Sequence, residues 1–200
     1  MHQQYETSAV VVATVRRLWA PSFDAMATTI SAVCGEYAML EDDVLKTDAI
    51  PRDRVVYVNP AYSPAVRKNG VDGIGLHLSK LIQTDVWARG CTLIALLPSL
   101  SHMDWFERWV GVCHEIHFIT GKLVFRNPYR ELKPDPKCYL WECRSYVLCV
   151  WRPGAVPSQP LVKFLTLDAP GNDMLELRSC ATCGKVRMLP RWLDQTRSEL

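Results

Sequence analysis

Apolar runs that alternate with polar turns predict a series of short β-strands along the chain. The clearest candidates are Ser22–Ala27, Val55–Asn59, Cys91–Pro98, Glu115–Thr120 and Cys138–Trp151, with Leu161–Leu167 as a weaker one. Residues 37–40 (YAML) form a further short candidate, which would be the second strand along the chain.

Helical periodicity separates several of these strands. Between the second and third clear strands, apolar residues recur at three- and four-residue spacing, at Ile74, Leu78, Leu81, Ile82 and Val86. After Cys91–Pro98, Ser101 is a candidate N-cap for a second helix, whose apolar face holds Met103, Phe106, Trp109 and Val110. A further helix or strand begins near Ala9.

Strands that alternate with helices of 10–15 residues favour an α/β fold with a largely parallel, Rossmann-like sheet. After Thr120 the pattern changes to GKLVF, a polar proline-rich loop at 127–137, and the long run Cys138–Trp151. This change predicts an antiparallel pair at the edge of the sheet. We expect a mobile tail at 1–8, one domain at 9–168, and a C-terminal tail at 169–200 that begins in the linker DAPGND.

The composition is that of an ordinary globular core. Hydrophobic residues make up 48% and charged residues 22% of the 200 residues. The net charge of +2 permits a nucleic-acid partner without requiring one. No apolar run reaches the roughly 18 residues of a membrane span, so no membrane partner is expected. Several of the eight cysteines lie inside apolar runs, and the first residues lack a basic signal-peptide start, which favours an intracellular protein.

Candidate chemistry gathers where the predicted strands end. The run Val55–Val58 stops at Asn59-Pro60-Ala61-Tyr62, which is either an ordinary turn or a pocket at the carboxyl edge of a parallel sheet. Asp24 lies among apolar residues in the first strand, and Glu41-Asp42-Asp43 follows about 18 residues later, where nucleotide-binding α/β domains place a ribose-binding acid. The sequence has no GxGxxG loop to cradle phosphates, which favours a nucleoside ligand such as S-adenosylmethionine over NAD or ATP.

Six ordered segments resemble the phage-type DNA N-6-adenine methyltransferases, the Dam-like family. The matching stretches are residues 23–37, 41–48, 55–63, 96–110, 115–125 and 147–154. The resemblance implies a fold shared with S-adenosylmethionine-dependent methyltransferases and methylation of the exocyclic amine of adenine in DNA. It also implies roles for single residues.

In the family's motif NPPY, which is Asn59-Pro60-Ala61-Tyr62 here, the Asn oxygen and the Pro carbonyl accept hydrogen bonds from the two N–H groups of the amine. The aromatic ring, Tyr62 in this chain, stacks on the flipped-out base. The resemblance assigns the cofactor to Asp24 and Ala27 and to Asp42 or Asp43, between which the sequence does not choose.

Three motifs depart from the family pattern. The second proline of NPPY is Ala61, the acidic-Cys-Ala segment keeps only its acid and its last alanine, and the usual basic and acidic residues after LLP are Leu100 and His102. These changes leave two alternatives open: a catalytically degenerate relative that binds nucleic acid or chromatin, and a methyltransferase that acts on RNA or on a protein amide. For a DNA partner, the basic loops Ser63–Asp72 and Arg126–Lys137 are the expected phosphate contacts.

The C-terminal tail carries a separate motif. Cys180 and Cys183, in the run CATCGKVRMLP, have the spacing of half a zinc knuckle and resemble the opening of a CW-type zinc finger. Two further cysteines of that finger are missing after Cys183, so zinc is a possible cofactor with an incomplete ligand set; Cys138 and Cys143 are the nearest candidates to complete it. A chromatin-reading module would favour a nuclear protein in a eukaryote. The sequence leaves the oligomeric state open.

Overall fold

The computed structural model describes residues 7–27, 32–39, 50–60, 73–120, 123, 145–167, 175–179 and 186–190. The chain divides into two units, Met1–Thr166 and Leu167–Leu200. In the first unit the strands are β1 (Phe23–Ala27), β2 (Glu36–Met39), β3 (Val55–Val58), β4 (Thr92–Pro98), β5 (Glu115–Thr120), β6 (Tyr146–Trp151) and β7 (Leu161–Thr166). The helices are α1 (Ala9–Trp19), α2 (Gly73–Lys80) with its π-helical continuation η2 (Leu81–Trp87), and the short π-helix η3 (Phe106–Val110).

The seven strands form one sheet in the order β2-β1-β3-β4-β6-β5-β7. β2, β1, β3 and β4 pair in parallel, and β7 pairs in parallel with β5. β6 runs antiparallel to both of its neighbours, β4 and β5. The predicted α/β class is therefore confirmed, and so is the antiparallel pair at one side of the sheet. The weaker strand candidate, β7, adds outside that pair.

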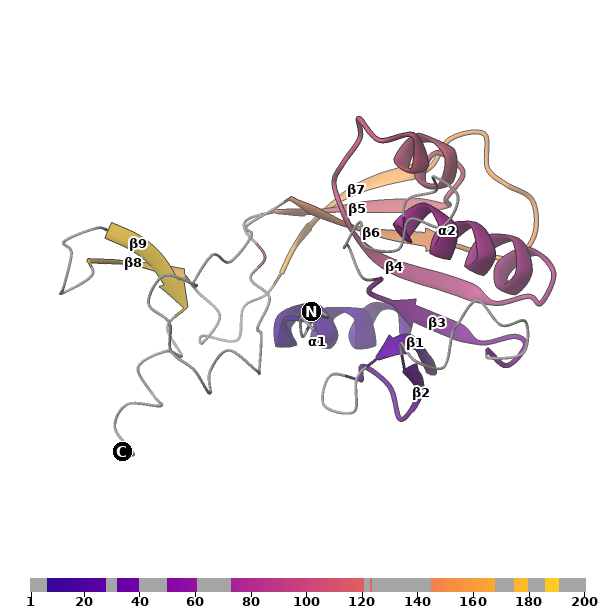
Figure 1. Ribbon diagram of the computed structural model, residues 1–200, viewed down its shortest axis with the longest axis horizontal. Coiled ribbons are helices and arrows are strands. Elements are labelled where there is room, and N and C mark those ends of the chain that lie inside the picture. The colour runs from indigo at the N-terminus through magenta and orange to yellow at the C-terminus, as the bar shows by residue number, and fades with distance from the viewer. Residues whose placement is uncertain are drawn as a thin grey trace. The chain divides into compact units, whose positions relative to one another are not determined.

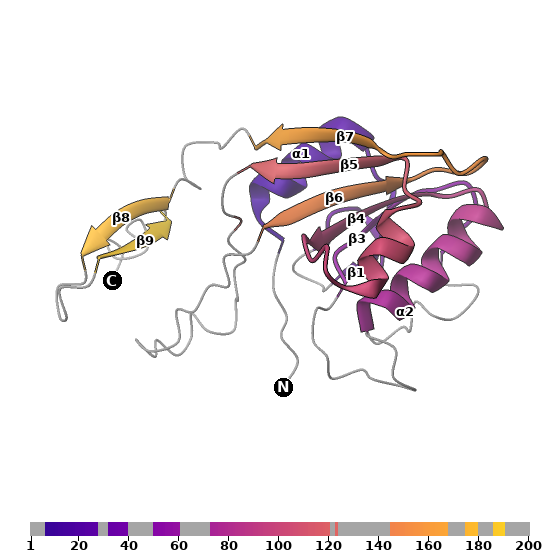
Figure 2. The same cartoon turned by 90° about the horizontal axis from the view of Figure 1, so that it is seen from above.

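Helices cover both faces of this sheet, with α1 and α2 on opposite sides (Figures 1 and 2). Alternate residues of β1, β3, β4 and β6 pack with α2, η2 and η3 into one apolar cluster that includes Ala25, Val58, Leu81 and Trp109. The five apolar positions that predicted a helix between Val55–Asn59 and Cys91–Pro98, from Ile74 to Val86, lie in α2 and η2 and are all buried. The side chains that point the other way in each strand belong to the face that α1 covers.

Two predicted boundaries differ from the structure. Ser101 lies in an exposed turn and the helical segment begins after it, so the prediction of Ser101 as N-cap is wrong. The turn forms because Met103 N–H bonds to the carbonyl of Leu100, before the helical pattern starts. Of the long candidate Cys138–Trp151, only Tyr146–Trp151 is strand among the described residues, and 138–144 lie outside them.

The second unit contains a two-stranded antiparallel sheet, β8 (Leu175–Ser179) with β9 (Val186–Pro190). Ser179 pairs with Val186, and Cys180 and Cys183 fall between these two residues in the sequence. Both cysteines lie outside the described residues. None of the helices in the described part of the chain has the length and hydropathy of a membrane span.

Candidate active site

Asp24 and Asn59 come from neighbouring parallel strands. Asp24 on β1 is in register with Tyr57 on β3, and Asn59 follows Tyr57 by two residues, just after β3 ends. With about 4.8 Å between strands and about 3.3 Å per residue, the two Cα atoms are roughly 8 Å apart. The two residues assigned to cofactor and substrate thus lie near each other at the carboxyl end of the parallel strands.

Asp24 is a buried carboxylate that accepts hydrogen bonds from the backbone. Its side chain accepts the N–H of Val33 at 2.9 Å and the N–H of Met26 at 3.3 Å, and the residue is 2% exposed. Burial raises the pKa of Asp24 to about 6, although these two hydrogen bonds act to lower it. A hydrogen-bond donor from a ligand would therefore stabilise the charged form of this buried carboxylate.

The described segment from Val33 to Cys34 lies beside Asp24. Arg16 of α1 donates from Nε to the Val33 carbonyl at 2.8 Å, which ties this segment to the helix. Cys34 donates from Sγ to the Pro21 carbonyl at 3.3 Å. Burial, and then the negative charge of Asp24, raise the pKa of Cys34 to about 11, so the thiol beside Asp24 is neutral at physiological pH.

A chain of hydrogen bonds connects the residues before α1 to Asn59. Asn59 donates from Nδ2 to the hydroxyl of Thr7 at 3.1 Å, and the same hydroxyl lies 3.3 Å from the Tyr57 hydroxyl. Tyr57 is 1% exposed, and burial raises its pKa well above the usual value. Asn59 is half-buried, whereas Pro60 and Ala27 are buried.

The remaining predicted site residues cannot be placed beside these. Tyr62 and Ala61, Asp42 and Asp43, and Cys180 and Cys183 lie outside the described residues. Among the residues that the structure describes, no group of three or more His, Cys, Asp and Glu side chains is arranged to hold a metal ion.

Two of the positions that depart from the family motifs have structural roles. Met26 and Leu100 are partly buried and pack against the main apolar cluster. His102, in contrast, is exposed. Leu100 therefore contributes packing at a position where the family carries a charge.

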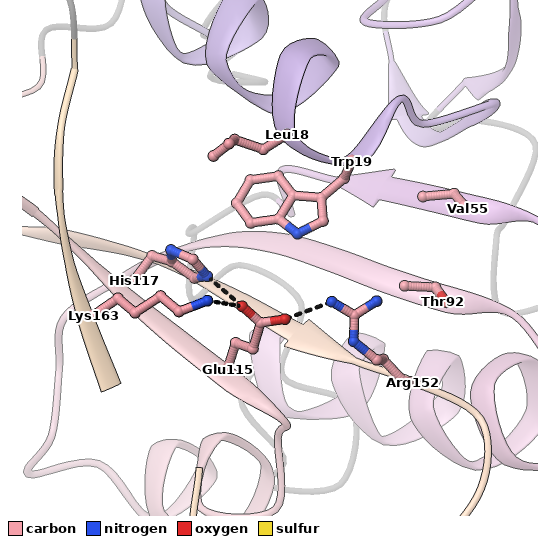
Figure 3. A pocket seen from close by; sticks show the side chains of 8 residues that line it. All are labelled: Leu18, Trp19, Val55, Thr92, Glu115, His117, Arg152 and Lys163. Carbon is pink, nitrogen blue, oxygen red and sulfur yellow. Dashed lines mark hydrogen bonds and ion pairs between the residues drawn. The ribbon is translucent and has the colours of Figure 1, made fainter. Parts of the chain in front are cut away.

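A cavity of about 390 Å³ lies elsewhere, at the amino ends of the parallel strands (Figure 3). It is lined by Leu18, Trp19, Val55, Thr92, Glu115, His117, Arg152 and Lys163. Val55 starts β3 whereas Asn59 follows its end, so cavity and site lie at opposite edges of the sheet.

The charged side chains of this cavity bind one another. Glu115 accepts hydrogen bonds from Lys163 at 2.8 Å and from Arg152 at 2.5 Å. The ring Nε2 of His117 lies 2.9 Å from the same carboxylate. These contacts join β5, β6 and β7 across the sheet, which is a structural role.

Sequence reasoning missed three residues of the site. The sequence predicts Thr7 in the tail before the helix and Tyr57 within an apolar strand, and it assigns no role to Cys34. A usable signal was the single hydroxyl inside the run Val55-Val56-Tyr57-Val58, because a buried Tyr hydroxyl usually has a hydrogen-bond partner. No local pattern pointed to Thr7, which reaches the site through the fold.

Comparisons with known proteins give two findings. The chain is similar in structure to a protein from Listeria monocytogenes that carries the assignment of a class I S-adenosylmethionine-dependent methyltransferase. The TM-score is 0.46 at 12% identity, with 80% of this chain and 56% of that chain covered. This chain thus spans little more than half the length of that protein. No protein with a curated description matches the sequence.

The second finding concerns the family. The model of the DNA N-6-adenine-methyltransferase (Dam) family matches residues 1–153, which is most of the chain and includes α1 and every strand from β1 to β6. The resemblance seen in the ordered sequence segments is confirmed by this match. The chain belongs to the DNA N-6-adenine-methyltransferase (Dam) family.

Proposed function

We propose that this protein is an S-adenosylmethionine-dependent methyltransferase that acts on the exocyclic amine of adenine in DNA. The observation that carries the proposal is the placement of Asp24 and Asn59 on adjacent parallel strands, on the sheet face that meets the start of α1. Membership of the Dam family supports the reaction class.

The described residues fit S-adenosylmethionine through Asp24. When bound, the cofactor supplies an electrophilic methyl group and presents hydroxyl and ammonium donors to the protein. The Asp24 carboxylate is buried, and burial raises its pKa to about 6. Ligand donors would satisfy the carboxylate where burial has removed water, which stabilises its charged form. Ala27 is buried at the end of β1, where a small side chain leaves room for a ligand.

Asn59 would bind and orient the target amine. The lone pair of that amine is delocalised into the purine ring, so the amine is a poor nucleophile. The amide oxygen of Asn59 and the carbonyl of Pro60 would accept hydrogen bonds from its two N–H groups and favour a geometry in which the lone pair faces the methyl donor. Asp24 would hold the cofactor that supplies the methyl group, while Asn59 and Pro60 would hold the amine, whose nitrogen would take the methyl group and lose one proton to water.

The alternative is a family member that has lost catalytic activity and only binds nucleic acid or chromatin. The packing of Leu100 against the apolar cluster favours it, because the resemblance implies a basic residue at a position that here holds a partly buried apolar side chain. Such a protein would still bind DNA or chromatin but would transfer no methyl group. RNA as the substrate is a second variant of the proposal, since the same amine is present there.

Methyl transfer can be tested directly with radiolabelled S-adenosylmethionine. Unmethylated double-stranded DNA and structured RNA would be incubated with the wild-type protein and with Asn59→Ala. The nucleic acids would then be digested and the labelled nucleoside identified. Gln83→Ala is a matched control, because it removes an amide side chain from an exposed position on η2.

We expect label on N6-methyladenine in DNA for the wild type and for Gln83→Ala, and a loss of at least about 100-fold for Asn59→Ala. Label on RNA alone would show that RNA is the substrate, and the protein would still be a methyltransferase. No label on either nucleic acid, from protein with an intact melting transition, would contradict the proposal and favour the binding-only alternative. Equal activity in Asn59→Ala would show that Asn59 has no role in methyl transfer.

A further inference from the structure

The residues before α1 contribute a side chain to the candidate site. Thr7 lies two residues before the helix, yet its hydroxyl meets Asn59 and Tyr57, which follow it by 52 and 50 residues. α1 packs on the sheet through Val10, Val11, Thr14 and Val15, and Ser8 accepts the first helical hydrogen bond, from Val12 N–H. The position of Thr7 is therefore fixed by the helix that follows it.

From this geometry we propose that Thr7 is a positioning residue for Asn59. The proposal rests on the methyl-transfer function proposed above and deepens it. The planar amide of Asn59 has a nitrogen branch and an oxygen branch, and the Thr7 hydroxyl accepts the N–H of the nitrogen branch at 3.1 Å. The oxygen branch then points away from Thr7, and in the proposed function it is this branch that would accept a hydrogen bond from the substrate amine.

Tyr57 supports the Thr7 hydroxyl from below the surface. A threonine hydroxyl has one hydrogen and two acceptor lone pairs, so it can take the N–H of Asn59 and also bond to the Tyr57 hydroxyl at 3.3 Å. Burial raises the pKa of Tyr57 above its usual range, so the Tyr57 side chain keeps its hydroxyl proton and can donate it in a hydrogen bond. The chain Tyr57–Thr7–Asn59 thus links a fixed group in the core to the half-buried amide.

A side-chain hydrogen bond of this kind contributes about 1 kcal/mol, which corresponds to a rate change of about 5-fold. We therefore expect Thr7→Val to lower kcat about 5-fold or more, with little change in the KM for DNA. Thr7→Ser keeps the hydroxyl and is expected to retain most of the activity. In an Asn59→Ala background, Thr7→Val is expected to cost nothing further, because its effect acts through the amide that is already missing.

A second measurement is independent of activity. The sequence has four asparagines, so the Asn59 side-chain amide can be assigned in an NMR spectrum by its loss in Asn59→Ala. We expect the two amide protons of Asn59 to exchange slowly with water and to have well-separated shifts in the wild type and in Thr7→Ser. In Thr7→Val the exchange is expected to accelerate and the shifts to approach those of a solvated amide.

The outcomes separate this inference from the proposed function. If the wild type transfers no methyl group but the amide of Asn59 responds to Thr7→Val, the positioning holds and the enzymatic function fails. If methyl transfer occurs and Thr7→Val changes neither kcat nor the amide signals, the inference is overturned while the function stands. An equal loss in Thr7→Ser and Thr7→Val would also overturn it, since the hydroxyl would then not be the cause.

Discussion

Replacing Asp24 by Asn should stabilise the protein at neutral pH and weaken its cofactor binding. Burial raises the pKa of Asp24 from 3.8 to about 6 in the folded protein. Below pH 3.8 the side chain is neutral in both the folded and the unfolded state. Above pH 6 it is charged in both, and the folded state bears the cost of burying that charge. The free energy of unfolding therefore falls as pH rises from 3.8 to 6.

The size of this effect follows from the pKa difference. A shift of about 2 pKa units corresponds to about 3 kcal/mol, because each unit is worth about 1.4 kcal/mol. Asparagine does not titrate, so Asp24→Asn lacks this cost. The variant's free energy of unfolding, relative to the wild type, should rise by up to about 3 kcal/mol between pH 4 and pH 7. Asparagine has only one side-chain oxygen, so it loses the hydrogen bond from either Val33 or Met26. This loss lowers the free energy of unfolding of Asp24→Asn by a similar amount at every pH.

Urea unfolding followed by tryptophan fluorescence at several pH values would measure this difference. Asp85→Asn is the control, because burial raises the pKa of Asp85 to about 6 as well, and Asp85 lies in η2 before β4 begins. Each variant should lose the part of the pH dependence that its own carboxyl contributes, but only Asp24→Asn should lose the thermal stabilisation that S-adenosylmethionine gives. A constant difference between Asp24→Asn and the wild type, within about 0.5 kcal/mol, would refute the reasoning.

Three further substitutions test other parts of the fold. Glu115→Gln should cost about 1–2 kcal/mol at pH 7. Burial acts to raise the pKa of Glu115, but hydrogen bonds, first from Lys163 and then from Arg152, lower it to about 2, so the wild-type advantage should vanish as pH falls from 4.5 toward 2 in denaturant titrations. Trp151→Phe removes the 2.9 Å hydrogen bond from Trp151 Nε1 to the Trp109 carbonyl; calorimetry should show a loss of about 1–3 kcal/mol, and an unchanged melting temperature would contradict this. Gly90→Ala introduces a Cβ at φ +75° and 2.5 Å from the Asp53 carboxylate. Urea unfolding should show a loss of about 1–2 kcal/mol in the free energy of unfolding, and equal stability would mean that Asp53 moves without cost.

The parallel half of the sheet could be predicted because its strands are buried on both faces. Val55–Val58 and Thr92–Pro98 read as continuous apolar runs, which is the pattern of a strand covered by helices on both sides. The helix at 73–87 followed from its own spacing. What the sequence could not show was the outermost pairing of β7 with β5, since all but one of the side chains from Leu161 to Thr166 are exposed.

The candidate site was predictable where one motif carries its residues and hidden where the fold brings them together. Asp24 and Asn59 were found because each lies in or just after an apolar strand, and parallel strands end at a common edge. Thr7 could not be found, because its contact with Asn59 depends on how α1 packs across the sheet. The sequence predicted the place of Tyr57 in a buried strand, but not the hydrogen bond of its hydroxyl with Thr7.

The placement of β6 has a consequence for synthesis of the chain on the ribosome. β4 and β5 are not neighbours; each pairs with β6, whose six residues are all buried. Until Trp151 has left the exit tunnel, both strands therefore lack the partner strand between them and expose apolar residues to solvent, which favours aggregation or chaperone binding. We expect a nascent chain arrested before Tyr146 to be captured by chaperones, and release to follow once β6 can insert.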